Sequence, residues 1–230
     1  MSAPAAAPAP QLWVVAGPNG AGKSSLAAKL LAHTVPMINP DDIAVQLRLH
    51  ASRSGVSNTS GLGSERALLA AAGREAVARQ RRLLAARATF GLETTLSGRR
   101  ELELMQAARA LGYKVNLVYV GLASAQASVL RVSQRVLAGG HDVPLVDIVR
   151  RYPRSLRNLP EALAAAHRAY VLDNSGLRRR LLLSVENGVV RHITPQMPAW
   201  AQDALPGTLL AAPAAALDPA RPPSLRSRPR

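Results

Sequence analysis

The 230-residue chain contains no cysteine and few aromatic side chains. The lack of cysteine excludes disulfide bonds and thiolate metal sites, and it is typical of proteins of the reducing cytoplasm. Aromatic residues make up 3% of the chain, so the core must consist mainly of leucine, valine, isoleucine and alanine. The same scarcity leaves little material for the stacking surfaces that bind single-stranded nucleic acids.

Long apolar runs are also missing. No stretch approaches the about 18 uncharged apolar residues of a membrane-spanning helix, and residues 1–10 lack the basic and apolar regions of a secretion signal. We therefore expect a cytoplasmic protein without a membrane span. The length predicts one domain, which we place at residues 11–195. The Ala- and Pro-rich residues 1–10 and the basic, Pro- and Ala-rich residues 196–230 are expected to be disordered tails.

Acidic residues are few relative to basic ones, 14 against 29, and the net charge is +15. One interpretation is a surface that binds nucleic acid. The other is an arginine-rich composition combined with a need to hold anionic substrates. Because the aromatic residues are scarce and scattered, we do not expect nucleic acid to be the main substrate.

Residues 17–24 read GPNGAGKS, the phosphate-binding pattern G-x-x-x-x-G-K-S. The apolar residues 12–16 before it predict a buried parallel strand, and the residues from Ser25 onward show apolar positions at helical spacing. A strand, a glycine loop and a helix in this order predict an α/β fold of the P-loop NTPase type. Such a fold has a mostly parallel sheet flanked by helices.

The residue types of this loop explain how it would hold a nucleoside triphosphate. The glycines let backbone N–H groups surround a phosphate, and the following helix adds its positive dipole end. Lys23 would reach the terminal phosphates, and the Ser24 hydroxyl would ligate Mg²⁺. A glycine turn that binds nothing is the alternative, and the complete pattern in its proper context argues against it. The predicted nucleotide-binding residues are Gly17, Pro18, Asn19, Gly20, Ala21, Gly22, Lys23, Ser24 and Ser25.

Acidic residues follow two further predicted strands. Asp41 and Asp42 come after the short apolar run 35–39, where either residue could cap a helix. In open α/β folds ligands bind beyond the carboxyl ends of the strands, so these carboxylates should share an edge with the phosphate loop. A hydroxyl that accepts a phosphoryl group needs a positioned base. We assign that role to Asp41 and the helix cap to Asp42.

The predicted strand 89–95 ends in Glu93 and Thr94 at the same edge. A carboxylate beside hydroxyl groups suits a sugar or polyol acceptor, because directed hydrogen bonds discriminate between such substrates. Glu93 and Thr94 are therefore candidate substrate-binding residues.

An arginine-bearing segment follows the next predicted strand. Residues 124–138 predict a helix that carries Arg131 and Arg135 on one face, and the sequence GGHDVP at 139–144 ends it. A second basic helical stretch follows. This arrangement, over residues 131–158, is typical of a lid that brings positive charge to a transferred phosphoryl group and excludes water. A merely solvated basic surface is the alternative interpretation.

Taken in order, these segments resemble the zeta toxin family of P-loop kinases, in its compact chromosomal branch. The resemblance covers about residues 11–176. Its pieces are GPNGAGKSSL at 17–26, INPDDIA at 38–44, ETTLSG at 93–98, YVGL at 119–122, RVSQRVLAGGHDVP at 131–144, RRYPRSLRNL at 150–159 and DNSG at 173–176.

The resemblance implies transfer of phosphate from ATP to a hydroxyl of UDP-N-acetylglucosamine, with Mg²⁺ as cofactor and an antitoxin as a possible partner. It implies that Lys23 and Ser24 hold the phosphates and Mg²⁺, that Asp41 is the catalytic base, and that Glu93 and Thr94 contact the acceptor.

The lid departs from the family pattern, which has two arginines. Arg131 or Arg135 can fill the first position, and His141 falls near the second. A neutral imidazole supplies no fixed charge there, although Arg150 or Arg151 could compensate. We take Arg135 as the catalytic arginine and Arg131 as a substrate-binding residue.

Two other functions fit the same residues. A small-molecule kinase that acts on an antibiotic, a nucleoside or another metabolite would have a similar site. A nucleotide- or nucleic-acid-binding module with slow hydrolysis would rely on the positive charge instead. The acidic residues at the strand ends argue against that module, because they would repel a phosphate backbone.

Overall fold

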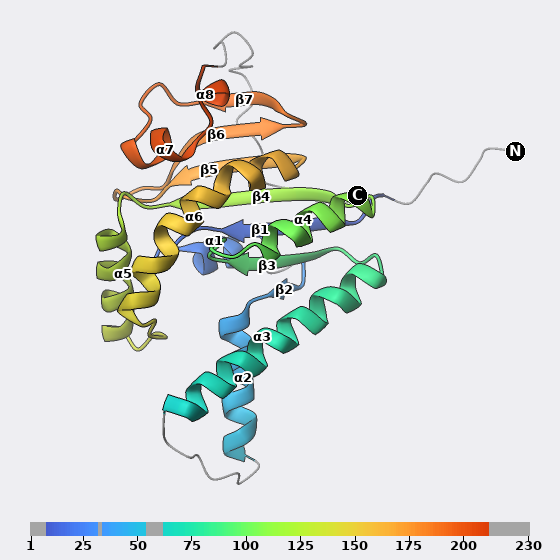
Figure 1. Ribbon diagram of the computed structural model, residues 1–230, viewed down its shortest axis with the longest axis vertical. Helices are drawn as coiled ribbons and strands as arrows, with labels where there is room; N and C mark the ends of the chain where they lie inside the picture. The colour runs from blue at the N-terminus through green and yellow to red at the C-terminus, as the bar shows by residue number, and fades with distance from the viewer. Residues whose placement is uncertain (1–7, 32–33, 54–61, 212–230) are drawn as a thin grey trace, which may run out of the picture.

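The protein is described here from a computed structural model, which places residues 8–31, 34–53 and 62–211. Residues 1–7 of the predicted N-terminal tail lie outside these ranges. Seven strands form one sheet in the order β2-β3-β1-β4-β5-β6-β7 (Figure 1). The strands are β1 (Gln11–Ala16), β2 (Met37–Ile38), β3 (Phe90–Thr94), β4 (Lys114–Gly121), β5 (Arg168–Asp173), β6 (Arg180–Glu186) and β7 (Val189–Ile193).

The first five strands run parallel, and the last two pair antiparallel with their neighbours. This mostly parallel sheet, flanked by helices, confirms the predicted α/β fold of the P-loop NTPase type. The helices are α1 (Lys23–Leu30), α2 (Pro40–Arg53), α3 (Leu62–Ala85), α4 (Arg100–Ala110), α5 (Ala125–Leu137), α6 (Leu145–Ala165), α7 (Ala199–Ala204) and α8 (Gly207–Leu210). Within the described ranges, none of these helices has the length and apolar character needed to cross a membrane.

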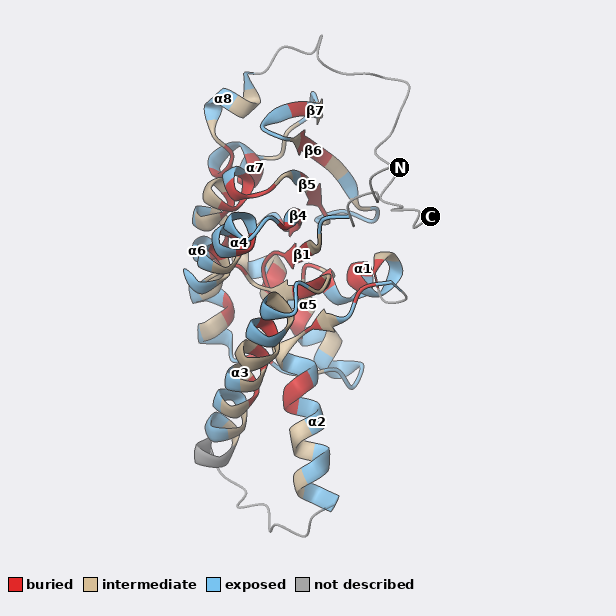
Figure 2. Ribbon diagram, turned by 90° about the vertical axis from the view of Figure 1, so that its right-hand side faces the viewer, coloured by how far each residue is buried: buried red, intermediate tan, exposed pale blue. Residues whose placement is uncertain are grey.

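The central strands β1 and β4 are buried on both faces of the sheet (Figure 2). Successive strand residues point to opposite faces, so a strand covered on both sides needs a nearly continuous apolar run. Accordingly, Leu12 and Val14 pack into one core cluster, and Trp13 and Val15 pack into the other. Helices α4, α6 and α7 cover one face, and α1 lies on the other (Figure 2).

Helices α2 and α3 pack against each other and extend away from the sheet beyond its β2 edge (Figure 1). Near their far end, one guanidinium nitrogen of Arg48 lies 2.7 Å and 2.9 Å from the two carboxylate oxygens of Glu65. This helix pair forms the outer wall of the space beyond the carboxyl end of β3.

The chain after residue 196 differs from the disordered tail predicted for residues 196–230. Helices α7 and α8 continue the fold, and Trp200 is only 5% exposed. Its indole packs so tightly on β4 that a Cβ atom on Gly121 would lie 2.1 Å from the ring. The predicted tail is therefore wrong for residues 199–210, because one large aromatic side chain can bury a short helix whose composition suggests disorder. Residues 212–230 lie outside the described ranges.

We expect Trp200→Ala to lower the free energy of unfolding by about 3–5 kcal/mol, as typical for loss of a buried aromatic ring. Urea unfolding monitored by circular dichroism measures this change. The matched control is Asp203→Ala on the exposed side of α7, which should stay within about 0.5 kcal/mol of the wild type. Equal stability of the Trp200 variant and the wild type would show that α7 does not anchor to β4.

Candidate active site

A cavity of about 1410 Å³ opens at the carboxyl ends of β1, β2 and β3. It brings together most of the site residues predicted from the sequence. Those that line it are Asn19, Gly20, Gly22, Lys23, Ser24, Ser25, Asp41, Glu93, Thr94, Arg131, Arg135, His141 and Arg151. The predicted loop residues Gly17, Pro18 and Ala21 are buried and are not part of this lining.

The phosphate loop has a backbone that glycine makes possible. Gly17 has a φ of 138° and Gly22 a φ of 85°, in the left-handed region that favours glycine. A Cβ atom on Gly17 would lie 2.1 Å from the carbonyl oxygen of Val120. The loop therefore packs directly on the backbone of the neighbouring strand β4, and helix α1 begins immediately after Gly22.

Lys23 folds back into its own loop. Its Nζ donates a hydrogen bond to the carbonyl oxygen of Pro18 at 3.0 Å, and the residue is 8% exposed. Burial lowers the pKa of Lys23, while the charges of Glu93 and Asp41 partly oppose that shift. The ammonium group thus carries a desolvation cost that a nearby anion would relieve.

Glu93 lies against the phosphate loop. The Ser24 hydroxyl donates to Glu93 Oε1 at 2.8 Å, and Asn39 Nδ2 donates to Oε2 at 3.3 Å. Burial raises the pKa of the Glu93 carboxyl, and the Lys23 charge and the Ser24 hydrogen bond partly oppose it. Glu93 therefore joins the loop to the end of β2, and Asn39 is a site residue that the sequence analysis missed. Its position directly after a strand and before a proline was the available signal.

The start of α2 corrects the assignment of its cap. Asn39 Oδ1 accepts a hydrogen bond from the backbone N–H of Asp41 at 3.0 Å, and Pro40 is the first residue of the helix. Asn39 is therefore the N-cap, and the prediction that Asp42 caps the helix is wrong. Proline is favoured at the first helical position because its fixed φ suits the helix and its missing N–H is not needed there. Asp41 is exposed in the cavity.

Thr94 also has a local role. Its Oγ1 accepts a hydrogen bond from the backbone N–H of Leu96 at 3.0 Å. Leu96 is buried with a φ of 55°, a conformation that is uncommon for a residue with a branched side chain. The Thr94 hydroxyl therefore supports the turn that follows β3 and still lies on the cavity wall.

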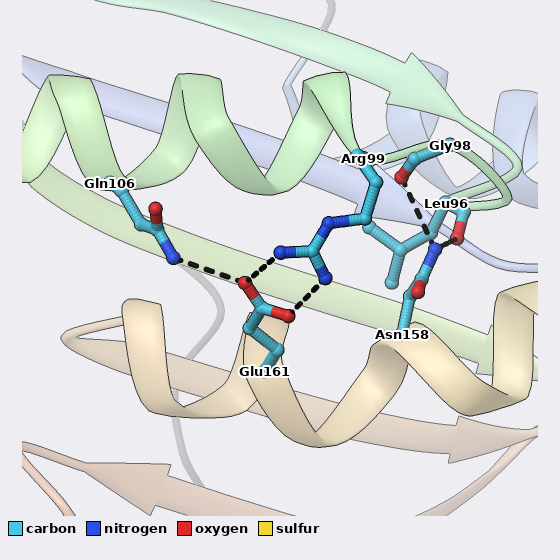
Figure 3. A network of polar contacts seen from close by, with 6 residues as sticks. All are labelled: Leu96, Gly98, Arg99, Gln106, Asn158 and Glu161. Atoms are coloured by element: carbon cyan, nitrogen blue, oxygen red, sulfur yellow. Dashed lines mark hydrogen bonds and ion pairs between the residues drawn. The ribbon is translucent and has the colours of Figure 1, made fainter.

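Helix α6 holds the segment that leaves β3 (Figure 3). Asn158 Nδ2 donates to the carbonyl oxygen of Leu96 at 2.9 Å and to that of Gly98 at 3.2 Å. Arg99 forms a two-pronged ion pair with Glu161, with contacts of 2.5 Å and 3.0 Å. Helix α6 and the segment that follows β3 are thus joined by direct hydrogen bonds.

The lid arginines divide into two groups. Arg131, Arg135 and Arg151 line the cavity, whereas Arg150 is outside its lining. Both Arg150 and Arg151 contact Asp147, at 2.6 Å and 3.3 Å. Of the two residues considered as compensation for His141, only Arg151 therefore lines the cavity.

The connection between β5 and β6 reaches back to the phosphate loop. Asn174 Nδ2 donates to the carbonyl oxygen of Ala21 at 2.9 Å. An Nη atom of Arg179 lies 3.5 Å from the position that a Cβ on Gly22 would occupy. Arg179 Nε is buried and has no hydrogen-bond partner among the described residues. Arg179 could not be singled out from the sequence, because it is the middle one of three consecutive arginines after the DNSG segment.

The strand, the phosphate loop, the buried lysine and the sheet order define a P-loop NTPase-like fold. The sequence model of the AAA domain family (AAA_33) matches residues 12–151, which is more than half of the chain. The protein therefore belongs to the AAA_33 family. The match contains the phosphate loop, the ends of β2 and β3, and the first part of the lid.

Known proteins resemble the chain at low sequence identity. An uncharacterized protein of Haemophilus influenzae (strain ATCC 51907 / DSM 11121 / KW20 / Rd) is 29% identical over 147 residues, which are 61% of this chain and 95% of that protein.

Two solved structures share the fold. The complex of AvrRxo1-ORF1 and AvrRxo1-ORF2 with ATP has a chain that is 19% identical, with a TM-score of 0.63 over 79% of this chain. This protein spans 60% of that chain's length. The PezAT chromosomal toxin–antitoxin system of Streptococcus pneumoniae has a chain that is 18% identical, with a TM-score of 0.51 over 75% of this chain and 72% of that one. At these identities the likeness shows a common fold.

Proposed function

We propose that the protein is a kinase that transfers the γ-phosphate of ATP to a hydroxyl group of a small-molecule acceptor. The observation that carries this proposal is one cavity lined by Lys23 and Ser24 of the phosphate loop, the exposed carboxylate of Asp41, and the lid residue Arg135. Phosphoryl transfer requires charge stabilisation on one side of the phosphate and a positioned base on the other. Lys23 and Arg135 are the candidates for the first role, and Asp41 is the candidate for the second.

The donor half is the phosphate loop. Its backbone N–H groups and the buried Lys23 would bind the β- and γ-phosphates. The Ser24 hydroxyl and the Glu93 carboxylate, 2.8 Å apart, are oxygen ligands of the kind that Mg²⁺ takes, directly or through water. A bound Mg²⁺ would neutralise charge on the phosphates. The raised pKa of buried Glu93 fits this assignment, because a neighbouring cation would favour its ionised form.

The acceptor half contains Asp41 and the wall formed by β3 and α3. The acceptor hydroxyl oxygen would attack the γ-phosphorus while the bond from that phosphorus to the bridging oxygen of ADP breaks. Asp41 would take the hydroxyl proton. Lys23 and Arg135 would stabilise the charge on the transferred group, and Arg131 would contact the substrate under the lid.

UDP-N-acetylglucosamine is the acceptor that we propose, with Glu93 and Thr94 among the residues at the acceptor end. This choice rests on the resemblance to the zeta toxin family and on the fold shared with the PezAT system. The same likeness supports an antitoxin as a partner, since both solved neighbours belong to two-component assemblies, AvrRxo1-ORF1 with AvrRxo1-ORF2 and the PezAT toxin–antitoxin system.

The test is incubation of the purified protein with ATP, Mg²⁺ and a panel of acceptors, followed by mass spectrometry. The panel contains UDP-N-acetylglucosamine, other sugar nucleotides, free nucleosides and aminoglycosides. We expect UDP-N-acetylglucosamine to gain one phosphate group, and a reaction without enzyme is the control. Phosphorylation of a different acceptor would support the assignment as a kinase and contradict UDP-N-acetylglucosamine as its acceptor. ATP consumption with no phosphorylated acceptor would contradict the proposed transfer.

A further inference from the structure

Helix α5 ends in a turn that closes directly on Arg135. Gly139 has a φ of 82°, and its N–H donates to the carbonyl oxygen of Val136 at 2.9 Å. The N–H of Gly140 donates to the carbonyl oxygen of Arg135, also at 2.9 Å. These paired bonds form a glycine C-cap of the 6→1 and 5→2 type. The loop that follows α5 therefore turns back on the helix at Arg135, four positions before Gly139.

The same turn also holds the side chain of Arg135. An Nη atom of Arg135 donates to the carbonyl oxygen of His141 at 2.6 Å. A Cβ atom on Gly140 would lie 2.6 Å from Arg135 Cγ and 3.3 Å from Cδ. The aliphatic stem of Arg135 thus lies across Gly140, and the guanidinium group is fixed at the next residue. Arg135 Nε is buried without a hydrogen-bond partner among the described residues, so the described part of the chain fixes the group chiefly through this carbonyl.

The clamped guanidinium group lies within electrostatic reach of the phosphate loop. Burial is the main cause that lowers the pKa of Lys23, and the charge of Arg135 adds to that effect. Both residues line the same cavity. Two cations held near each other in a partly buried cavity are stabilised by an anion between them, as the terminal phosphates of a nucleotide would be.

We propose that Gly140 and the backbone carbonyl of His141 are positioning groups that hold the Arg135 guanidinium in place for phosphoryl transfer. This inference rests on the proposed function, because the position of Arg135 affects the rate only if Arg135 stabilises the transferred phosphate. The proposal also assigns a role to the loop at residues 139–144 that does not require a second arginine at the position of His141. His141 contributes its carbonyl oxygen, which any residue would present, and the glycine before it leaves room for the arginine stem.

The test is a double-mutant cycle with Gly140→Ala, Arg135→Ala and the combined variant, measured as kcat for phosphate transfer and as Kd for ATP. We expect Gly140→Ala to lower kcat about tenfold or more, since small displacements of catalytic groups have effects up to about 10²-fold. Its Kd for ATP should stay within about twofold. Arg135→Ala should lower kcat about 10²-fold. The combined variant should match Arg135→Ala, because no stem remains for the new methyl group to displace.

The matched control is Gly207→Ala, a glycine-to-alanine change outside the cavity lining, where the new Cβ meets no atom within 4 Å. It should keep the wild-type kcat. A combined variant that loses a further tenfold relative to Arg135→Ala would overturn the positioning role, as would a wild-type rate for Gly140→Ala. A wild-type rate for Arg135→Ala would instead contradict the assignment of Arg135 in the proposed function.

A second measurement needs no turnover. Solvent exchange of the Arg135 guanidinium protons, followed by ¹⁵N nuclear magnetic resonance, reports directly on the hydrogen bond from Arg135 to the carbonyl oxygen of His141. We expect slower exchange in the wild type than in Gly140→Ala, with Arg135→Lys used to assign the signal. Equal exchange in the two proteins would overturn the inference even if phosphate transfer occurs.

Discussion

Replacing Lys23 with methionine is expected to reduce phosphate transfer roughly 10³-fold, by analogy with removal of other preorganised charges from active sites. Methionine fills nearly the same space as the lysine stem, so the loop should keep its shape. The ammonium group is the positive charge that the phosphate loop itself contributes to the cavity. Initial rates with the acceptor identified by mass spectrometry measure the loss.

The same substitution should not weaken the folded protein. Burial lowers the pKa of Lys23, so its protonated form is less favourable in the folded chain than in the unfolded chain at neutral pH. The free energy of unfolding of Lys23→Met without nucleotide should therefore be at least that of the wild type, measured by urea unfolding. Lys29→Met, on an exposed position of α1, is the control and should keep the wild-type rate. A fully active Lys23 variant would contradict the whole donor half of the site.

Asp41→Asn is expected to lower phosphate transfer by about 10²–10⁴-fold, the usual contribution of a general base. The Kd for ATP should stay within about threefold, because Asp41 belongs to the first turn of α2 and not to the phosphate loop. The asparagine side chain keeps the shape and removes the ability to accept a proton. Single-turnover kinetics with labelled ATP separate the chemical step from binding.

The adjacent Asp42→Asn is the matched control for Asp41→Asn. It removes the same charge one residue further along α2, from a side chain that is not part of the cavity lining. The charges of Asp41 and Asp42 both act on Glu93 in the same direction, so the two variants change the field in the cavity in the same sense. The control should keep a rate close to the wild type, because of the two residues only Asp41 lines the cavity. Equal losses in the two variants would show that net charge, and not proton transfer, explains the effect of Asp41.

The sequence was sufficient where the deciding interactions are local. The phosphate loop was predicted residue by residue, because glycine spacing, a preceding strand and a following helix all lie within about twenty positions. The central strand β4 also carries a local signal, because burial on both faces imposes an unbroken apolar run. The turn between β6 and β7 is equally local, because Asn187 and Gly188 adopt the positive φ values that a two-residue hairpin turn needs.

The sequence was insufficient where the deciding contacts are distant. The hydrogen bond between Ser24 and Glu93 joins residues 69 positions apart, and no periodicity encodes it. Trp200 was assigned to a tail because its neighbours are proline and alanine, although one indole against the backbone of Gly121 is enough to fold that segment. The side chain of Arg135 is held by the carbonyl oxygen of His141. Every residue type has a carbonyl oxygen, so the sequence cannot reveal this contact.

Trp200 gives the chain a built-in optical probe that is connected to the phosphate loop through Asp173 and Asn174. Its indole N–H donates to Asp173 at 3.2 Å, and Asn174 next to it holds the phosphate loop through Ala21. The chain has only one other tryptophan, Trp13 on β1. Tryptophan emission from a Trp13→Phe protein therefore comes from Trp200 alone. Its wavelength depends on the surroundings of an indole that contacts Asp173, next to the residue that holds the phosphate loop.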